Sequence, residues 1–105
     1  MRLNAKETEI ISKAAAECFG ADVDVRLFGS RADDSKKGGD IDLYIATSET
    51  DTAAVMRAEL AFLVSVKRRI GDQKIDLVVD YPGRRARPAI LDIARRTGIP
   101  IRRPT

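Results

Sequence analysis

The stretch "LFGSRADDSKKGGDIDLYI", residues 27–45, decides the fold because a polar segment lies between two apolar ones. The apolar residues recur at every second position on both sides of it, at Val23, Val25 and Leu27 and at Ile41, Leu43 and Ile45. This period predicts two strands. Gly29 ends the first strand, and residues 30–39 are expected to form a polar loop with one short helical turn.

Three helices and a further strand are expected around this stretch. The apolar spacing predicts a helix over 4–19 with Asn4 as its N-cap, and a second from Thr50 or Asp51 to Ile70. A third strand is predicted over 75–79 and a closing helix over 88–97. The apolar face of the second helix is predicted to consist of Val55, Met56, Leu60, Phe62, Leu63, Val66 and Ile70. The order predicts an α/β (α+β) fold, a small mixed sheet of about three strands with helices packed on one side.

Length and composition limit the classes of protein. The 105 residues fit one domain, 1–105. Aromatic residues make up 5% and Trp is absent, which argues against a base-stacking nucleic-acid platform and predicts no direct nucleic-acid partner. No stretch resembles a signal peptide or approaches the roughly 20 apolar residues of a membrane span, so no membrane contact and a cytoplasmic location are expected.

The cysteine and histidine content limits the chemistry. Cys18 is the one cysteine and there is no histidine, which excludes an intrachain disulfide, a structural zinc site and imidazole catalysis. Cys18 is predicted to be a small core residue. Any catalysis must therefore use carboxylates, hydroxyls, Lys, Arg or a hard metal ion.

The pattern Asp-x-Asp occurs twice, and its two copies differ in context. Asp22 and Asp24 flank the first strand without a glycine-rich neighbour and are predicted to face solvent. Asp40 and Asp42 precede and enter the second strand, where residues two apart project to the same face. Two carboxylates so close repel each other unless a cation lies between them, and oxygen ligands suit Mg²⁺.

A third carboxylate, Asp76, lies inside the third strand between apolar neighbours. If the second and third strands are adjacent, Asp76 joins Asp40 and Asp42. Three such carboxylates can hold two metal ions about 4 Å apart, as in phosphoryl transfer. Asp80, at the end of the same strand, is predicted to be a solvated turn residue.

The residues after the first strand suit a phosphate group. Gly29 lets the backbone approach closely, and Ser30 offers a hydroxyl and an N–H. The cationic residues that can balance phosphate charge are Arg31, Lys36 and Lys37. The alternative, left open by the residues alone, is a glycine-rich surface hairpin with acids at the mouth of a strand.

The combination "LFGSRA…GDIDLYI…KIDLVVD" resembles the DNA polymerase β-like nucleotidyltransferase superfamily, and the chain is most similar to its minimal nucleotidyltransferases. The resemblance implies that Gly29 and Ser30 bind the terminal phosphates of ATP, with Arg31 and Lys36 nearby. It implies that Asp40, Asp42 and Asp76 are catalytic and ligate two Mg²⁺ ions. Many relatives have Arg-Gly where this chain has Asp33 and Asp34.

Minimal nucleotidyltransferases often act as antitoxins beside a HEPN-domain toxin. The resemblance therefore implies transfer of AMP from ATP to a hydroxyl of the toxin, expected to be tyrosine, within a hetero-oligomer. Two alternatives stay open: an antitoxin that neutralises its partner by binding alone, and a transferase for a small molecule such as an aminoglycoside.

The segment 81–105 contains seven arginines and one acidic residue, Asp92. One interpretation is a solvated surface with arginines near helix ends. The other is a contact surface for an acidic partner or for RNA, and we expect it to contribute to partner docking.

Overall fold

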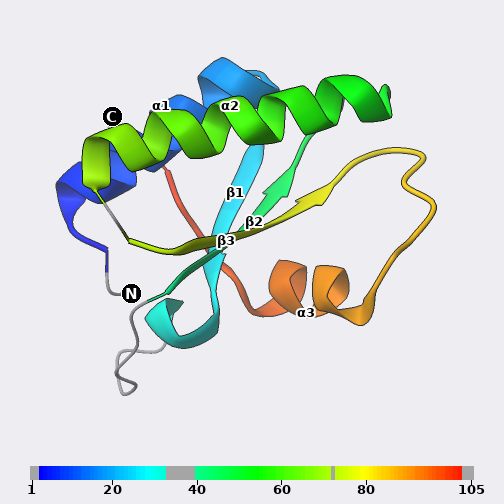
Figure 1. Ribbon diagram of the computed structural model, residues 1–105. Helices are drawn as coiled ribbons and strands as arrows, with labels where there is room; N and C mark the ends of the chain where they lie inside the picture. The colour runs from blue at the N-terminus through cyan, green and yellow to red at the C-terminus, as the bar shows by residue number, and fades with distance from the viewer. Residues whose placement is uncertain (1–2, 33–39, 72, 103–105) are drawn as a thin grey trace.

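The computed structural model describes residues 3–32, 40–71 and 73–102 (Figure 1). Its elements, in chain order, are α1 (Ala5–Phe19), β1 (Asp24–Phe28), the 3₁₀ turn η1 (Gly29–Ala32), β2 (Ile41–Ala46), α2 (Thr52–Ile70), β3 (Ile75–Asp80), α3 (Ala89–Thr97) and β4 (Ile99–Pro100). This confirms the predicted α/β class, the three helices and the first three strands. No helix within the described ranges is long and apolar enough to cross a membrane.

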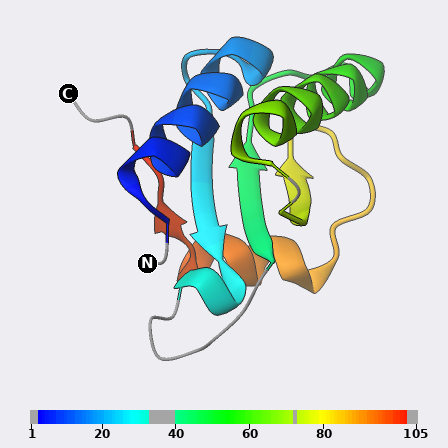
Figure 2. The same ribbon diagram turned by 60° about the vertical axis from the view of Figure 1, so that its left-hand side comes forward.

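The sheet is mixed, with strand order β3-β2-β1-β4. β2 and β3 are parallel and joined by α2, whereas β1 is antiparallel to both of its neighbours. The strand β4 adds to the three that the sequence predicts, and Figure 2 shows it beside β1 at the end of the sheet. Its two residues are too few to show a period, so the pattern could not reveal it.

The helices lie on both faces of the sheet, so the expectation of one covered side was wrong. α1 and α2 cover one face and α3 lies against the other (Figures 1 and 2). The first face holds the main core, where Ile11, Leu27, Leu43 and Phe62 are fully buried. On the other face α3 buries the ring of Tyr44.

Local sequence explains the start of α1. The side chain of Asn4 accepts a hydrogen bond from the N–H of Glu7 at 2.7 Å, and the Glu7 carboxylate accepts one from the N–H of Asn4 at 3.1 Å. This reciprocal pair satisfies donors that the helix leaves open. Cys18 packs partly buried against the main core, as predicted, and this burial raises the pKa of its thiol.

The apolar face predicted for α2 was too broad. Phe62 and Val66 are buried, but Met56 is 64% exposed and Leu60 is 66% exposed. Val64, two turns after Met56, is also 45% exposed. Residues at this four-residue spacing lie on one line along a helix, beside the buried face rather than within it.

Candidate active site

Asp42 and Asp76 lie directly opposite each other on neighbouring strands. β2 and β3 are adjacent, which meets the condition for Asp76 to join the site, and their register pairs these two residues. Ile41 and Leu43, on either side of Asp42, are fully buried under the helices of the main core. Because alternate residues of a strand face opposite ways, Asp42 and Asp76 share the face on which α3 lies.

On that face the helix α3 packs over Tyr44. Its residues Leu91 and Ala94 pack on Tyr44, with Phe28 and Val78 at the margin of this cluster. Asp42 lies two residues before Tyr44 in β2, so the pair of Asp42 and Asp76 is the next one on this face of the sheet. Asp42 is half-buried and Asp76 is exposed. Solvent therefore reaches Asp76 and, in part, Asp42.

The charges at this end oppose ionisation of Asp42. Burial raises the pKa of the Asp42 carboxyl above its ordinary value, and the charges of Asp76 and Asp40 and a hydrogen bond with Asp76 raise it further. Asp40 precedes β2 and forms a 3.8 Å ion pair with Lys74, which precedes β3. Among the described residues, no basic side chain forms an ion pair with Asp42 or Asp76.

Gly29 leaves room for the Asp42 carboxylate because it has no side chain. A Cβ at this position would overlap the carboxylate, and the residue has a φ of +73°. Glycine adopts this left-handed region without the steric penalty that other residues incur. The chain turns here from β1 into η1, so the predicted phosphate-binding glycine and the predicted metal ligand lie in contact.

The other predicted site residues are only partly located. The backbone of Ser30 and Arg31 lies in η1, next to Gly29. Lys36, Lys37, Asp33 and Asp34 fall outside the described residues. Across residues 3–32, 40–71 and 73–102, no three acidic, cysteine or histidine side chains lie close enough together to hold a metal ion. The fold thus brings Asp42 and Asp76 together, while Asp40 is paired with Lys74.

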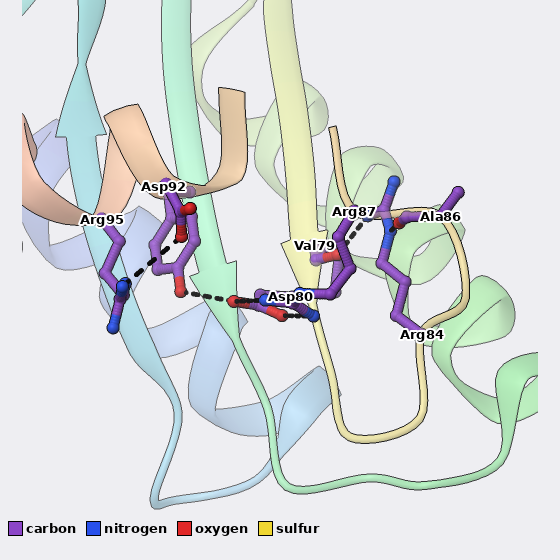
Figure 3. Close-up of polar contacts among 8 residues, drawn as sticks. Val79, Asp80, Arg84, Ala86, Arg87, Asp92 and Arg95 are labelled. Atoms are coloured by element: carbon purple, nitrogen blue, oxygen red, sulfur yellow. Dashed lines mark hydrogen bonds and ion pairs between the residues drawn. The ribbon is translucent and has the colours of Figure 1, made fainter. Parts of the chain in front are cut away.

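Asp80 is not a solvated turn residue, which corrects the prediction from sequence. The hydroxyl of Tyr44 donates a hydrogen bond to its carboxylate at 3.0 Å, and Arg87 forms an ion pair with it at 2.9 Å (Figure 3). The side chain of Asp80 is 17% exposed. Hydrogen bonding from Arg87 and Tyr44 lowers the pKa of Asp80, whereas burial and the neighbouring Asp80 raise the pKa of Tyr44 to about 12.

Several arginines of the basic segment have partners within the chain. Arg84 donates hydrogen bonds to the carbonyl groups of Val79 and Ala86, and Arg95 pairs with Asp92 (Figure 3). Arg84 and Arg87 fasten the 81–88 loop to β3, whereas the Arg95 pair lies within α3. The side chains of Arg87 and Arg95 are 50% and 58% exposed, and Arg95 and Arg96 lie in the last turn of α3, which agrees with the interpretation of a solvated surface with arginines near helix ends.

The first Asp-x-Asp pair has an ordinary role. Asp22 is exposed, as predicted. Asp24 is 41% exposed and forms a 3.0 Å ion pair with Arg26. The guanidinium of Arg26 also donates to the carbonyl oxygen of Arg95 at 2.6 Å, which ties α3 to β1.

The comparison with known families agrees with this geometry. The family model described as a nucleotidyltransferase domain matches residues 9–98, from within α1 to the end of α3. No curated protein shows significant similarity to the chain. The match spans both strands of the aspartate pair and the turn at Gly29.

Proposed function

The chain belongs to the nucleotidyltransferase domain family, and from that premise we propose that it transfers AMP from ATP to a hydroxyl of a protein partner. The observation that carries the proposal is the facing pair of Asp42 and Asp76, together with the raised pKa of Asp42. Crowded acids without a basic partner are typical of sites that bind a cation or move a proton.

The donor set fits magnesium. Asp42 and Asp76 present carboxylate oxygens, which hard cations prefer, and their mutual repulsion falls when a cation is shared. Asp40 would complete the set by exchanging its contact with Lys74 for the metal. When bound, Mg²⁺ would neutralise phosphate charge and lower the pKa of the attacking hydroxyl.

The residues of the chain have separate tasks in the proposed reaction. Gly29 and Ser30, with Arg31 and Lys36, position the terminal phosphates of ATP. The acceptor oxygen forms a bond to the α-phosphorus, and the bond from that phosphorus to the bridging oxygen breaks, so pyrophosphate leaves with the electron pair. The carboxylate of Asp76 receives the proton of the hydroxyl.

The acceptor that we propose is a tyrosine of a HEPN-domain toxin, which the AMP group would silence. Asp76 is exposed and Asp42 is half-buried, so the pair can be contacted from outside the chain. An incoming protein can then complete the wall of the site and exclude water from it.

The experiment that tests the proposal is mass measurement of the toxin after incubation with the chain, ATP and Mg²⁺. We expect one or more added AMP groups, and no addition with Asp42→Asn or Asp76→Asn. Neutralisation of the toxin without any added mass would favour the antitoxin that acts by binding alone.

A further inference from the structure

An apolar stripe on α2 has no partner within the described part of the chain. It consists of Met56, Leu60 and Val64, which are 64%, 66% and 45% exposed. They are spaced by four residues, so they lie on one line along the helix. Exposed apolar residues in a row, unlike scattered ones, are typical of a surface that contacts another protein.

A groove continues the stripe onto the edge of the sheet. It has a volume of about 520 Å³ and lies between α2, the edge strand β3 and the loop after β3. Met56 and Glu59 line it from α2, Leu77 from β3, and Arg84 and Arg85 from the loop. Figure 1 shows this loop beside the first turns of α2. The stripe and the groove form one surface, which we call the α2 surface.

The charge around the stripe is basic. The exposed bases of α2 are Arg57, Lys67, Arg68 and Arg69, and the groove adds Arg84 and Arg85. Glu59 is the one acidic residue of α2, and it is half-buried. Opposite charges across an interface favour association, and like charges oppose it.

This charge distribution decides between the possible occupants. A second copy packed by its own α2 would add four more bases to the interface and only one acid of that helix, Glu59, to balance them, which is unfavourable. RNA would use the bases but gains nothing from a central line of apolar side chains. An acidic protein with an apolar helical face satisfies both features.

We propose that the α2 surface is the docking site for an acidic protein partner that presents an amphipathic helix. The identification of this partner with the acceptor protein rests on the proposed function. α2 ends at Ile70 and β3 begins at Ile75, so the Val64 end of the stripe is the end next to Asp76. Asp42 and Asp76 face the other side of the sheet, so a partner lying along α2 must also extend around the edge strand β3 to reach them.

The first test uses the full chain and a fluorescent peptide of roughly 18 residues, about five helical turns, with leucines on one face and glutamates on the other. We expect binding at least about tenfold tighter than for the same peptide with lysines, and weakening as salt rises. Leu60→Asp should weaken it at least about tenfold. The control Ile93→Asp, which changes an apolar residue of α3 that is 43% exposed, should leave it unchanged.

Three results of this test overturn the proposal. They are equal peptide binding by Leu60→Asp and the unchanged chain, tighter binding of the lysine peptide or of a uridine oligonucleotide, and a dimer of the chain that Leu60→Asp dissociates. Leu60 is mostly exposed, so its replacement should leave the unfolding temperature unchanged, which separates loss of docking from loss of fold.

A second measurement separates this inference from the proposed reaction. The chain is purified with its HEPN-domain acceptor, and both retention and added AMP are recorded. We expect Leu60→Asp to lose retention and transfer, and Asp42→Asn to lose transfer alone. Normal retention and transfer with Leu60→Asp overturns the docking site and leaves the reaction standing. Retention that depends on Leu60 without transfer overturns the reaction and leaves the docking site standing.

Discussion

Asp76 and Asp80 lie on the same face of β3, four residues apart, yet their surroundings are opposite. Asp80 accepts a hydrogen bond from Tyr44 and pairs with Arg87, and these contacts lower its pKa. Asp76 faces Asp42, and the proximity of the two acids contributes to the raised pKa of Asp42. One strand thus carries a neutralised carboxylate at one end and a crowded one at the other.

The difference shows that the charge of Asp80 stabilises the fold, whereas the charges of Asp42 and Asp76 destabilise it. The partners of Asp80 connect β3 with β2 and with the 81–88 loop, so its charge stabilises the folded state. The crowding of Asp42 and Asp76 costs stability, and an unfavourable arrangement persists where the surrounding structure enforces it, commonly at functional sites. The comparison predicts opposite consequences of removing the two kinds of charge.

The largest effect is expected for activity at the crowded end. Asp42→Asn should lower the rate of nucleotidyl transfer at least about a thousandfold, because a proposed ligand and charge are lost together. The rate is measured from AMP added to the acceptor protein. Asp22→Asn, at the exposed first pair, serves as the control and should keep the full rate. A similar loss from both changes would contradict the distinction between the two Asp-x-Asp pairs.

The next effect concerns the contact between Gly29 and Asp42. Gly29→Ala should destabilise the fold by about 2–4 kcal/mol, because the new Cβ meets the carboxylate and the backbone is left-handed. The control is Gly83→Ala, where φ is +82° and no atom lies within 4 Å of an added Cβ. It should cost about 1 kcal/mol from the backbone alone. Urea unfolding measures both, and equal losses would show that the carboxylate does not occupy the place described.

At the neutralised end, Asp80→Asn should destabilise the fold by about 1–2 kcal/mol at pH 7. The folded-state pKa of Asp80 is lowered, so its contribution is present above the unfolded-state pKa near 3.9 and is lost as pH falls through the folded value. The difference between the unchanged chain and the variant should therefore shrink in acid. Urea unfolding at several pH values tests this, and a difference that grows in acid would contradict it.

The aspartate pair could be predicted from sequence because two local rules suffice. The period of two places Asp42 on one face of its strand while Ile41 and Leu43 enter the core. The helix between the second and third strands favours a parallel connection, and the pair follows on the condition, met in the structure, that β3 lies beside β2. Neither step requires knowledge of distant contacts.

The features that were missed depend on distant contacts or on very short segments. Asp80 was misjudged because its partners are Tyr44, 36 residues earlier, and Arg87, beyond a turn. The face covered by α3 has a weak signal, since Tyr44 is the one large apolar side chain that β2 presents there, between Asp42 and Ala46 on the same face. Met56 and Leu60 were placed in the core because the helix is apolar around more than one side, and sequence does not show which side a sheet covers.

The smallest effect is also the sharpest test of the comparison. Without metal at pH 7, Asp42→Asn should raise the free energy of unfolding by a few tenths to about 1 kcal/mol, although it abolishes activity. The folded-state pKa of Asp42 is raised, so its ionised form destabilises the fold above that pKa, and the cost vanishes below the unfolded-state value near 3.9. The gain in the free energy of unfolding should therefore be present at neutral pH and absent in acid, opposite in sign to the effect at Asp80.

Added Mg²⁺ should stabilise the unchanged chain more than the Asp42→Asn variant, since a ligand that binds only the folded state shifts unfolding by mass action. A variant less stable than the unchanged chain without metal would mean that Asp42 has favourable contacts like those of Asp80, and the two ends of β3 would then not differ in kind.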